Sequence, residues 1–320
     1  MTFIRPLKYL PLNDNAARQL IDSTTIHDEY RRAIAAARQY QGGMYWKNQG
    51  QYSYLVKTKP DNSQVRIGPR SQETEAIYSE FASRKNDAES RLSSLRAALV
   101  DAERLNKALK VGRVPSIVVA VLQAFEDAGI AEHFVVVGTH ALYAYETAAG
   151  VRITQSALAT QDVDLLWDAR QKVRFIANME RLNISVLDLL KKVDPSFQRK
   201  EDHVSAAINA KGFEIEFLRR MQQDDDDHPF QLSSHEEDLW VIQAKRANVL
   251  TEAPRFEHVV VAANGDMVLM RTIDPRVFVE FKRWMATKAQ GRPASKRRRD
   301  EQQALIVQSM LDEGILLPDR

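Results

Sequence analysis

Apolar and polar positions in the first third of the chain follow two different periods. Apolar residues recur at helical spacing over residues 13–41, and the pair Gly42-Gly43 ends that pattern. The segment MYWKNQGQYSYLVKTKPDNSQVRIG then alternates aromatic or apolar residues with polar ones around two turn signals, which predicts a small antiparallel ribbon. Residues 71–110 contain neither Gly nor Pro, and their leucines recur at helical spacing, which predicts one long helix or two in succession.

The middle of the chain changes period repeatedly. HFVVVG predicts a buried strand, THALYAYETAAG predicts a helix that ends at Gly150, and DVDLLW predicts a second strand after an irregular segment. Helical spacing follows over residues 170–182 and 185–192. The segment VSAAINAKGFEIEFL then predicts two strands joined at Lys211-Gly212.

The last part of the chain predicts a hairpin and two helices. FEHVVVAANGDMVLMRT has its turn at Asn264-Gly265, which is a strong hairpin signal. The two helices are expected over residues 274–290 and 295–313, separated by Gly291-Arg292-Pro293. The elements together predict an α+β protein with a mixed sheet.

A composition break at residues 111–115 suggests how the chain is divided. Pro115 suits the first turn of the helix that it precedes, and 320 residues exceed one average domain. We therefore expect an N-terminal helical segment with the ribbon over residues 1–114. A core follows over residues 115–272, and a C-terminal helical segment over residues 273–320.

Composition limits the class of protein. A hydrophobic content of 44% and a charged content of 28% are typical of a folded globular protein, and the absence of cysteine excludes disulfides, thiolate metal sites and a cysteine nucleophile. No signal peptide or membrane-spanning apolar run is present, so we expect a cytoplasmic location and no association with a membrane. A net charge of +2 is too small to mark a nucleic-acid binder, and no feature indicates an oligomeric state.

Acidic pairs in two predicted strands are the first candidate chemistry. Asp162 and Asp164 share one face of their strand because side chains alternate with a period of two. Adjacent like charges call for a cation, and Mg²⁺ takes carboxylate and phosphate oxygens. Glu214 and Glu216 also share a face and supply a third carboxylate, although such a strand is often only a solvated face.

A turn between the first strand and its helix is the second candidate. Gly138 allows close backbone approach to a phosphate, the helix after it presents free N–H groups, and Thr139 adds a hydroxyl. Either feature alone is weak, since Gly-Thr after a strand is usually only a turn. The order of the turn, the Asp pair and the later acid is more specific, and it suits phosphoryl transfer assisted by metal ions.

These motifs resemble those of the nucleotidyltransferase superfamily with the polymerase-beta-like fold. The resemblance is carried by Val137-Gly138-Thr139, by Asp162-Val163-Asp164 and by Thr160. It implies an NTP donor, nucleotide binding at Gly138 and Thr139, and Mg²⁺ or Mn²⁺ held by the catalytic residues Asp162, Asp164 and Glu216. The segments GGMYWK, GPRSQET, GRVP, DPRVFVEFKRW and KRRRDEQQA further resemble a bacterial family of nucleotidyltransferase-fold proteins, a resemblance that carries no established substrate.

Two departures from the superfamily pattern change the expectations. The interval between Thr139 and Asp162 is longer than usual, so residues from Val151 to Ala159 are expected to form an inserted loop near the nucleotide. The third acid is Glu instead of the commoner Asp, which leaves Glu214 as a rival to Glu216.

The C-terminal segment concentrates positive charge. Eight basic residues and no acidic residue lie between Lys282 and Arg299. They form either a solvated helix end or a phosphate clamp, in which Lys282 meets the triphosphate and residues 296–299 meet an RNA backbone.

Two functions follow from these features. The leading hypothesis is a Mg²⁺-dependent transfer of a nucleoside monophosphate from an NTP to an acceptor hydroxyl, with an RNA end favoured over a protein or small molecule. The alternative is a non-catalytic nucleotide- or RNA-binding regulatory module. The presence of all three acids argues against that alternative.

Three further features have two readings each. The ribbon aromatics could stack bases but more often pack on helices; they are Tyr45, Trp46, Tyr52 and Tyr54. His140 is expected to be packed and not a general base. The acidic run of residues 224–227 is expected to be a solvated loop, with cation binding as the weaker reading.

Overall fold

The computed structural model describes residues 8–158, 160–222 and 230–318, so the acidic run of residues 224–227 lies outside the described residues. The chain forms two compact units, one of Arg18–Ala108 and one of Met1–Ala17 together with Leu109–Arg320. The mixture of helices with a mixed sheet confirms the predicted α+β class. No described helix is long and apolar enough to cross a membrane.

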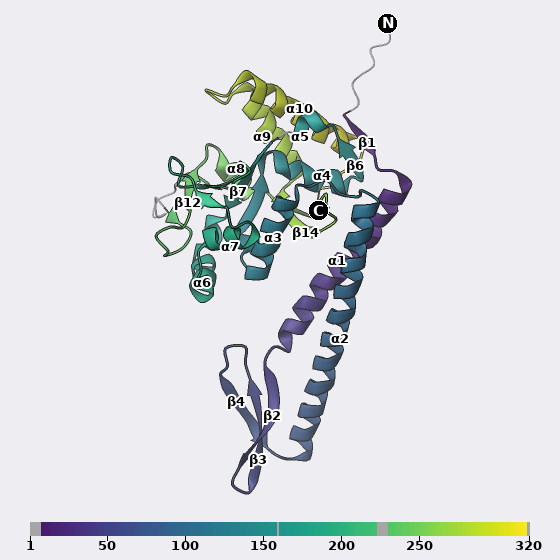
Figure 1. Cartoon of the computed structure of the whole chain (residues 1–320), viewed down its shortest axis with the longest axis vertical. Helices are drawn as coiled ribbons and strands as arrows, with labels where there is room; N and C mark the ends of the chain where they lie inside the picture. The colour runs from purple at the N-terminus through teal and green to yellow at the C-terminus, as the bar shows by residue number, and fades with distance from the viewer. Residues whose placement is uncertain (1–7, 159, 223–229, 319–320) are drawn as a thin grey trace. The chain divides into compact units, whose positions relative to one another are not determined.

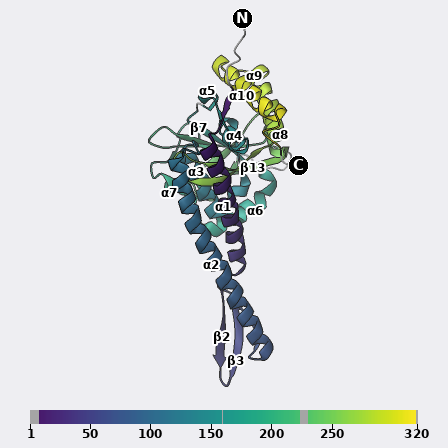
Figure 2. The same ribbon diagram turned by 90° about the vertical axis from the view of Figure 1, so that its right-hand side faces the viewer.

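The smaller unit contains two helices and a three-stranded ribbon. Its elements are α1 (Asp14–Gln39, which begins in the larger unit), β2 (Gly43–Gln49), β3 (Tyr52–Thr58), β4 (Gln64–Pro69) and α2 (Gln72–Ala108). The predicted ribbon is confirmed, with β3 paired antiparallel to both neighbours. The α2 segment is one helix, since no Gly or Pro interrupts it. It runs beside α1 (Figures 1 and 2), where the Gln19 amide donates to Asn106 Oδ1 at 3.1 Å.

The larger unit contains the remaining elements. In chain order these are β1 (Tyr9–Pro11), α3 (Ser116–Ala128), η1 (Ala131–His133), β5 (Phe134–Val137), η2 (Gly138–His140), α4 (Ala141–Ala148), β6 (Val151–Ile153), α5 (Gln155–Leu158), β7 (Asp162–Trp167), η3 (Ala169–Gln171), α6 (Lys172–Leu182), α7 (Val186–Val193), β8 (Gln198–Arg199), β9 (Ala206–Ile208), β10 (Glu214–Arg219), β11 (Phe230–Gln231), β12 (Trp240–Gln243), α8 (Ala247–Glu252), β13 (Arg255–Val261), β14 (Met267–Ile273), α9 (Pro275–Thr287) and α10 (Ala294–Asp312).

A mixed sheet organises this unit. Among the described residues it has seven strands, with β11, β12, β10, β7 and β5 in that order and with β9 joining β10 to β8. β10 is parallel to β7, whereas β5 is antiparallel to β7. A parallel pair needs a long crossover, and the connection from β7 to β10 contains α6 and α7.

The two central strands bury one face and leave the other polar. Val163 and Leu165 of β7, and Ile215 and Phe217 of β10, are at most 2% exposed. Phe217 reaches Phe125 of α3, with ring centroids 6.5 Å apart. Each such buried side chain stabilises the fold by about 2 kcal/mol. Because side chains alternate, this burial turns the acidic residues of both strands to the opposite face.

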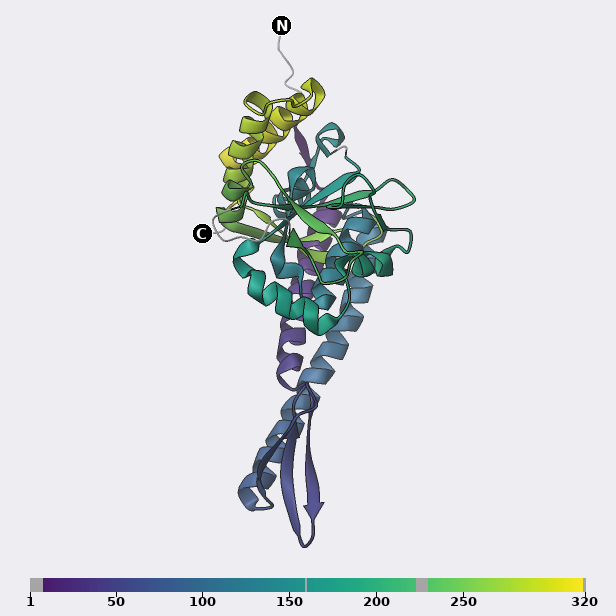
Figure 3. The same cartoon turned by 90° about the vertical axis from the view of Figure 1, so that its left-hand side faces the viewer.

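Both predicted hairpins and both predicted C-terminal helices are present. β9 pairs antiparallel with β10, and β13 pairs antiparallel with β14 across the Asn264-Gly265 turn. α9 begins where the Asp274 carboxylate accepts the Arg276 backbone N–H at 2.8 Å. Figure 3 shows α9 and α10 lying against each other.

The inserted loop expected from Val151 to Ala159 is wrong for its described residues. β6 pairs antiparallel with β1, so that Val151 lies opposite Pro11 and Ile153 lies opposite Tyr9, and α5 follows β6. A strand of three residues is too short to show alternation, and its partner comes from the distant N-terminal part of the chain. Local sequence patterns therefore could not predict it.

Candidate active site

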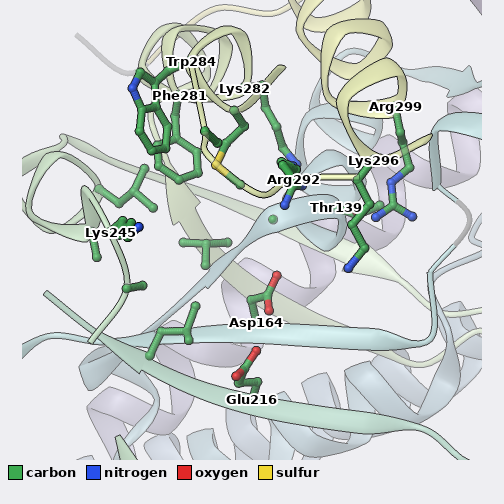
Figure 4. A pocket seen from close by; sticks show the side chains of 18 of the residues that line it. Thr139, Asp164, Glu216, Lys245, Phe281, Lys282, Trp284, Arg292, Lys296 and Arg299 are labelled. Carbon is green, nitrogen blue, oxygen red and sulfur yellow. The ribbon is translucent and has the colours of Figure 1, made fainter. Parts of the chain in front are cut away.

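Strand register brings the predicted acids together. In the parallel pair, Asp164 lies opposite Glu216 and Asp162 lies opposite Glu214. Asp162, Asp164 and Glu216 all line a cavity of about 720 Å³. Figure 4 shows the side chains of Asp164 and Glu216 on neighbouring strands and directed into this cavity. The cavity therefore has an acidic floor made by β7 and β10.

The carboxylates on the floor of the cavity disfavour one another's ionised form. Burial, helped by the nearby carboxylates of Asp162 and Glu216, raises the pKa of Asp164 to about 7. Burial also raises the pKa of Glu216, with a contribution from Glu214. A cation between these groups would remove the repulsion.

The other two acids have different partners. The Lys200 ammonium donates to Glu214 Oε2 at 2.9 Å, and Glu214 is not among the cavity-lining residues. Asp162 is exposed, and its Oδ1 accepts a hydrogen bond from the Thr160 hydroxyl. Glu214 is therefore compensated by a lysine, whereas Glu216 faces the cavity.

The predicted Gly-Thr turn borders the acidic floor. Gly138 has a φ of +69°, and a Cβ added there would overlap the Asp164 carboxylate. Its missing side chain thus makes room for Asp164, as well as exposing backbone to the cavity. Thr139 also lines the cavity, and its hydroxyl accepts a hydrogen bond from Gln303 Nε2 at 3.1 Å. A hydroxyl that accepts one bond still has its proton to donate.

Lys282 lies in the cavity wall, but it is already paired. Its ammonium contacts Asp300 Oδ1 at 3.0 Å, and Asp300 is fully buried and also accepts from Arg292 Nε. Burial lowers the pKa of Lys282, while Asp300 and Asp164 act in the opposite direction. Sequence reasoning missed Asp300 because it lies one residue beyond the basic run. Its position on a helix opposite buried Lys282 could be seen only in the fold.

The basic run of residues 296–299 is divided by the helix that carries it. Lys296 and Arg299, which are three positions apart, line the cavity. Arg297 instead donates to the backbone carbonyls of Arg292 and Ala289, at 3.1 and 2.8 Å. Arg298 is exposed. Figure 4 shows Lys296 and Arg299 on the side of the cavity that also carries Lys282 and Arg292.

The packed reading of His140 agrees with its surroundings. His140 is 1% exposed and lies against the rings of Tyr143 and Phe213, with centroids 5.6 and 6.3 Å away. Burial lowers its pKa to about 4, so the ring is neutral at neutral pH.

The ribbon aromatics have partners within the smaller unit. Trp46 packs on Tyr78 of α2 with ring centroids 6.0 Å apart, and the Arg66 guanidinium lies 3.1 Å from the centre of the Tyr54 ring. Tyr52 is 65% exposed. Trp46 thus packs on a helix as predicted, whereas Tyr54 contacts Arg66 of the neighbouring strand β4.

A second part of the cavity was missed from the sequence. Opposite the basic side, α9 places Phe281, Trp284 and Met285 in the wall, and Leu218 and Leu250 complete it. The sequence signal for this wall is that its apolar residues are spaced three and four positions apart within a helix rich in charged residues. That pattern usually indicates core packing.

The donor atoms of the floor suit a hard divalent cation, although the side chains do not form a closed site. No described group of three or more Asp, Glu, His or Cys side chains is arranged to hold a metal ion. The donors available are carboxylates of Asp162, Asp164 and Glu216, which are the oxygen ligands that Mg²⁺ and Mn²⁺ prefer.

Comparison with known proteins identifies the family of the chain. A family model described as nucleotidyltransferase matches residues 116–317, which run from α3 to beyond the end of α10. No curated protein and no solved structure matches the chain. The matched residues are more than half of the chain and include the acidic floor, the Gly-Thr turn and Lys282. The chain therefore belongs to the nucleotidyltransferase family.

Proposed function

We propose that the protein transfers a nucleoside monophosphate from an NTP to an acceptor hydroxyl, using Mg²⁺ or Mn²⁺ held by Asp162, Asp164 and Glu216. The observation that supports this most is the register of β7 and β10, which puts Asp164 and Glu216 side by side in a cavity. A cavity of about 720 Å³ has the size of a small-molecule site.

The charges in the cavity suit a triphosphate. Its lining contains six basic residues and three acidic ones; the basic residues are Lys245, Lys282, Lys288, Arg292, Lys296 and Arg299. In our proposal Arg292, Lys296 and Arg299 meet the phosphates directly, together with the Gly138 backbone and the Thr139 hydroxyl. Lys282 supports them from the wall, where Asp300 holds it.

The reaction can be written with all its atoms. The acceptor oxygen forms a bond to the α-phosphorus, the bond from that phosphorus to the bridging oxygen breaks, and pyrophosphate leaves with the electron pair. The acceptor proton goes to solvent. Bound divalent cations would lower the pKa of the acceptor hydroxyl and neutralise the leaving pyrophosphate. The carboxylates of β7 and β10 would orient those cations, and the basic wall would align the triphosphate.

The acceptor that we propose is an RNA end. Its support is the positive charge at the start of α10, where exposed Arg298 is available to a phosphate backbone beside the cavity residues Lys296 and Arg299. A protein hydroxyl or a small molecule would use the same donor chemistry, so the labelled product decides among them.

The test is transfer of label from each NTP in turn. The full-length protein is incubated with Mg²⁺ or Mn²⁺ and total RNA, protein or small-molecule fractions, with the NTP labelled at either the α- or the γ-phosphate. We expect α-label in RNA and γ-label in pyrophosphate. Transfer of γ-label to an acceptor would indicate a kinase instead. NTP binding without any transfer would favour the non-catalytic module.

A matched variant ties the activity to this site. Asp164→Asn keeps the size of the side chain and removes its charge, so we expect loss of transfer with the fold retained. Arg298→Gln should leave NTP binding unchanged and weaken RNA binding with a reduced salt dependence, because it removes one phosphate contact. If Asp164→Asn transfers label at the normal rate, the proposed site is wrong.

A further inference from the structure

The cavity has two chemically different ends: basic side chains dominate one, and the other carries aromatic and apolar side chains together with Lys245 (Figure 4). Phe281, Trp284 and Met285 are spaced three and four residues apart, so they share one face of α9. Lys282 is turned by about 100° from Phe281 around the helix axis. Figure 4 shows Phe281 and Trp284 on the opposite side of the cavity from Lys296 and Arg299. We call the end formed by Phe281, Trp284, Met285, Leu218 and Leu250 the aromatic end.

The aromatic residues are partly open to the cavity and are held in place. Phe281 and Trp284 are half-buried, and their ring centroids are 6.1 Å apart at an angle of 31°. The Arg246 guanidinium lies 5.1 Å from the centre of the Trp284 ring, within the range of a cation–π contact. The indole is therefore positioned before any ligand arrives.

The backbone beside the aromatic end is strained. Arg246 has φ +59° and ψ +16°, a left-handed conformation that costs a non-glycine residue about 1 kcal/mol. Such residues persist where their surroundings hold them, and they concentrate at ligand sites. Here the strained residue is the one whose side chain contacts Trp284, and its neighbour Lys245 lines the cavity.

We propose that the aromatic end binds the nucleobase of the donor NTP by stacking on Trp284 and Phe281. This inference rests on the proposed function. A nucleotide has a flat apolar base at one end and a polyanion at the other, and the cavity has the same division. Phe281 and Lys282 are consecutive, so the aromatic end begins beside the basic wall. A nucleotide requires such closeness, because a single ribose separates its base from its phosphates.

Stacking predicts tolerance of different bases. Every base has a π face, and removal of an aromatic partner typically weakens binding by about tenfold to a hundredfold. We therefore expect Trp284→Ala to weaken binding of all four NTPs by at least about tenfold, and Trp284→Phe to retain most of the affinity.

The experiment compares each NTP with inorganic tripolyphosphate, which has the phosphates and lacks the base. Dissociation constants are measured by calorimetry on the full-length protein in the presence of Mg²⁺, for the unaltered chain, Trp284→Ala, Trp284→Phe and Phe281→Leu. We expect Trp284→Ala to bind tripolyphosphate as tightly as the unaltered chain does, which also shows that the variant is folded.

Fluorescence supplies a second readout. NTP, but not tripolyphosphate, should change the emission of Trp284, and the change should vanish in Trp284→Phe. It should survive in Trp46→Phe, because Trp46 is not a cavity-lining residue.

The outcomes separate the two proposals. Unchanged NTP affinity in Trp284→Ala, or an equal loss for NTP and tripolyphosphate, would overturn the base subsite while leaving nucleotide transfer possible. Failure of the unaltered chain to bind any NTP would overturn the proposed function itself.

Discussion

Replacing Asp300 by Ala is expected to destabilise the larger unit severely. Asp300 is fully buried and holds two cations, Lys282 at 3.0 Å and Arg292, whose side chains are 5% and 19% exposed. Its removal leaves a buried ammonium without compensation, which costs about 3 to 5 kcal/mol. The free energy of unfolding of a typical domain is about 5 to 15 kcal/mol, so this loss is a large share of it.

The assay is urea unfolding followed by tryptophan fluorescence, since three of the four tryptophans lie in the larger unit, at positions 167, 240 and 284. With a slope of about 2 kcal/mol per molar urea, the midpoint should fall by about 2 M. Glu237→Ala is the matched control, because that carboxylate is 82% exposed and 4.0 Å from Arg199. Its loss should be below about 1 kcal/mol.

A double variant tests the physical cause. Lys282→Met combined with Asp300→Leu removes both charges of this pair and keeps apolar volume. Arg292 loses its partner in the double variant as it does in Asp300→Leu alone, so the double variant should still cost less than the sum of the two single changes by at least about 1 kcal/mol. If Asp300→Ala costs no more than Glu237→Ala, or if the double variant is additive, Asp300 does not act by neutralising a buried cation.

Two further predictions concern a glycine and a histidine. Gly138→Ala should slow transfer at least about tenfold, because the added Cβ overlaps the Asp164 carboxylate. The control is Gly150→Ala, which has a similar φ of +64° and open space beside it. Thermal unfolding of this control should show only the cost of backbone strain, about 1 to 2 kcal/mol. Burial, helped by the positive charge of Arg31, lowers the pKa of His27 to about 4 from 6.5, so the unfolded chain binds the proton first as pH falls. The contribution of His27 to the free energy of unfolding should therefore be full above pH 6.5 and decrease by up to about 3 kcal/mol as the pH falls towards 4. Melting curves measured across this pH range should show a weaker pH dependence for His27→Leu than for the unaltered chain.

Elements with strong local patterns could be predicted from the sequence. The alternation in DVDLLW and FEIEFL correctly separates buried Val163 and Phe217 from the acids on the opposite face. The Asn264-Gly265 turn defines its hairpin, and the absence of Gly and Pro from residues 72–108 gives a single helix. Each of these depends on neighbours a few residues apart.

Features that depend on distant partners could not be predicted. β6 exists because β1 pairs with it, and Lys282 can be buried because Asp300 on α10 accepts a hydrogen bond from its ammonium. The division of residues 296–299 depends on which side of α10 meets the cavity. The sequence alone shows a run of basic residues. In the helix, Lys296 and Arg299 line the cavity, whereas Arg297 donates to the backbone carbonyl of Ala289.

The choice between Glu216 and Glu214 tests the proposed site most directly. Both lie on β10, but Glu216 faces the cavity opposite Asp164 while Glu214 is paired with Lys200. The measurement is the rate of α-label transfer at saturating NTP by Glu216→Gln and Glu214→Gln. We expect Glu216→Gln to be slower by about a hundredfold or more, because several kcal/mol of charge stabilisation are lost, and Glu214→Gln to be slower by less than about tenfold. The opposite order would contradict the assignment of Glu216 as the third ligand and move that role to Glu214. Equal rates close to that of the unaltered chain would contradict the assignment of the carboxylates of β7 and β10 as the centre of the reaction.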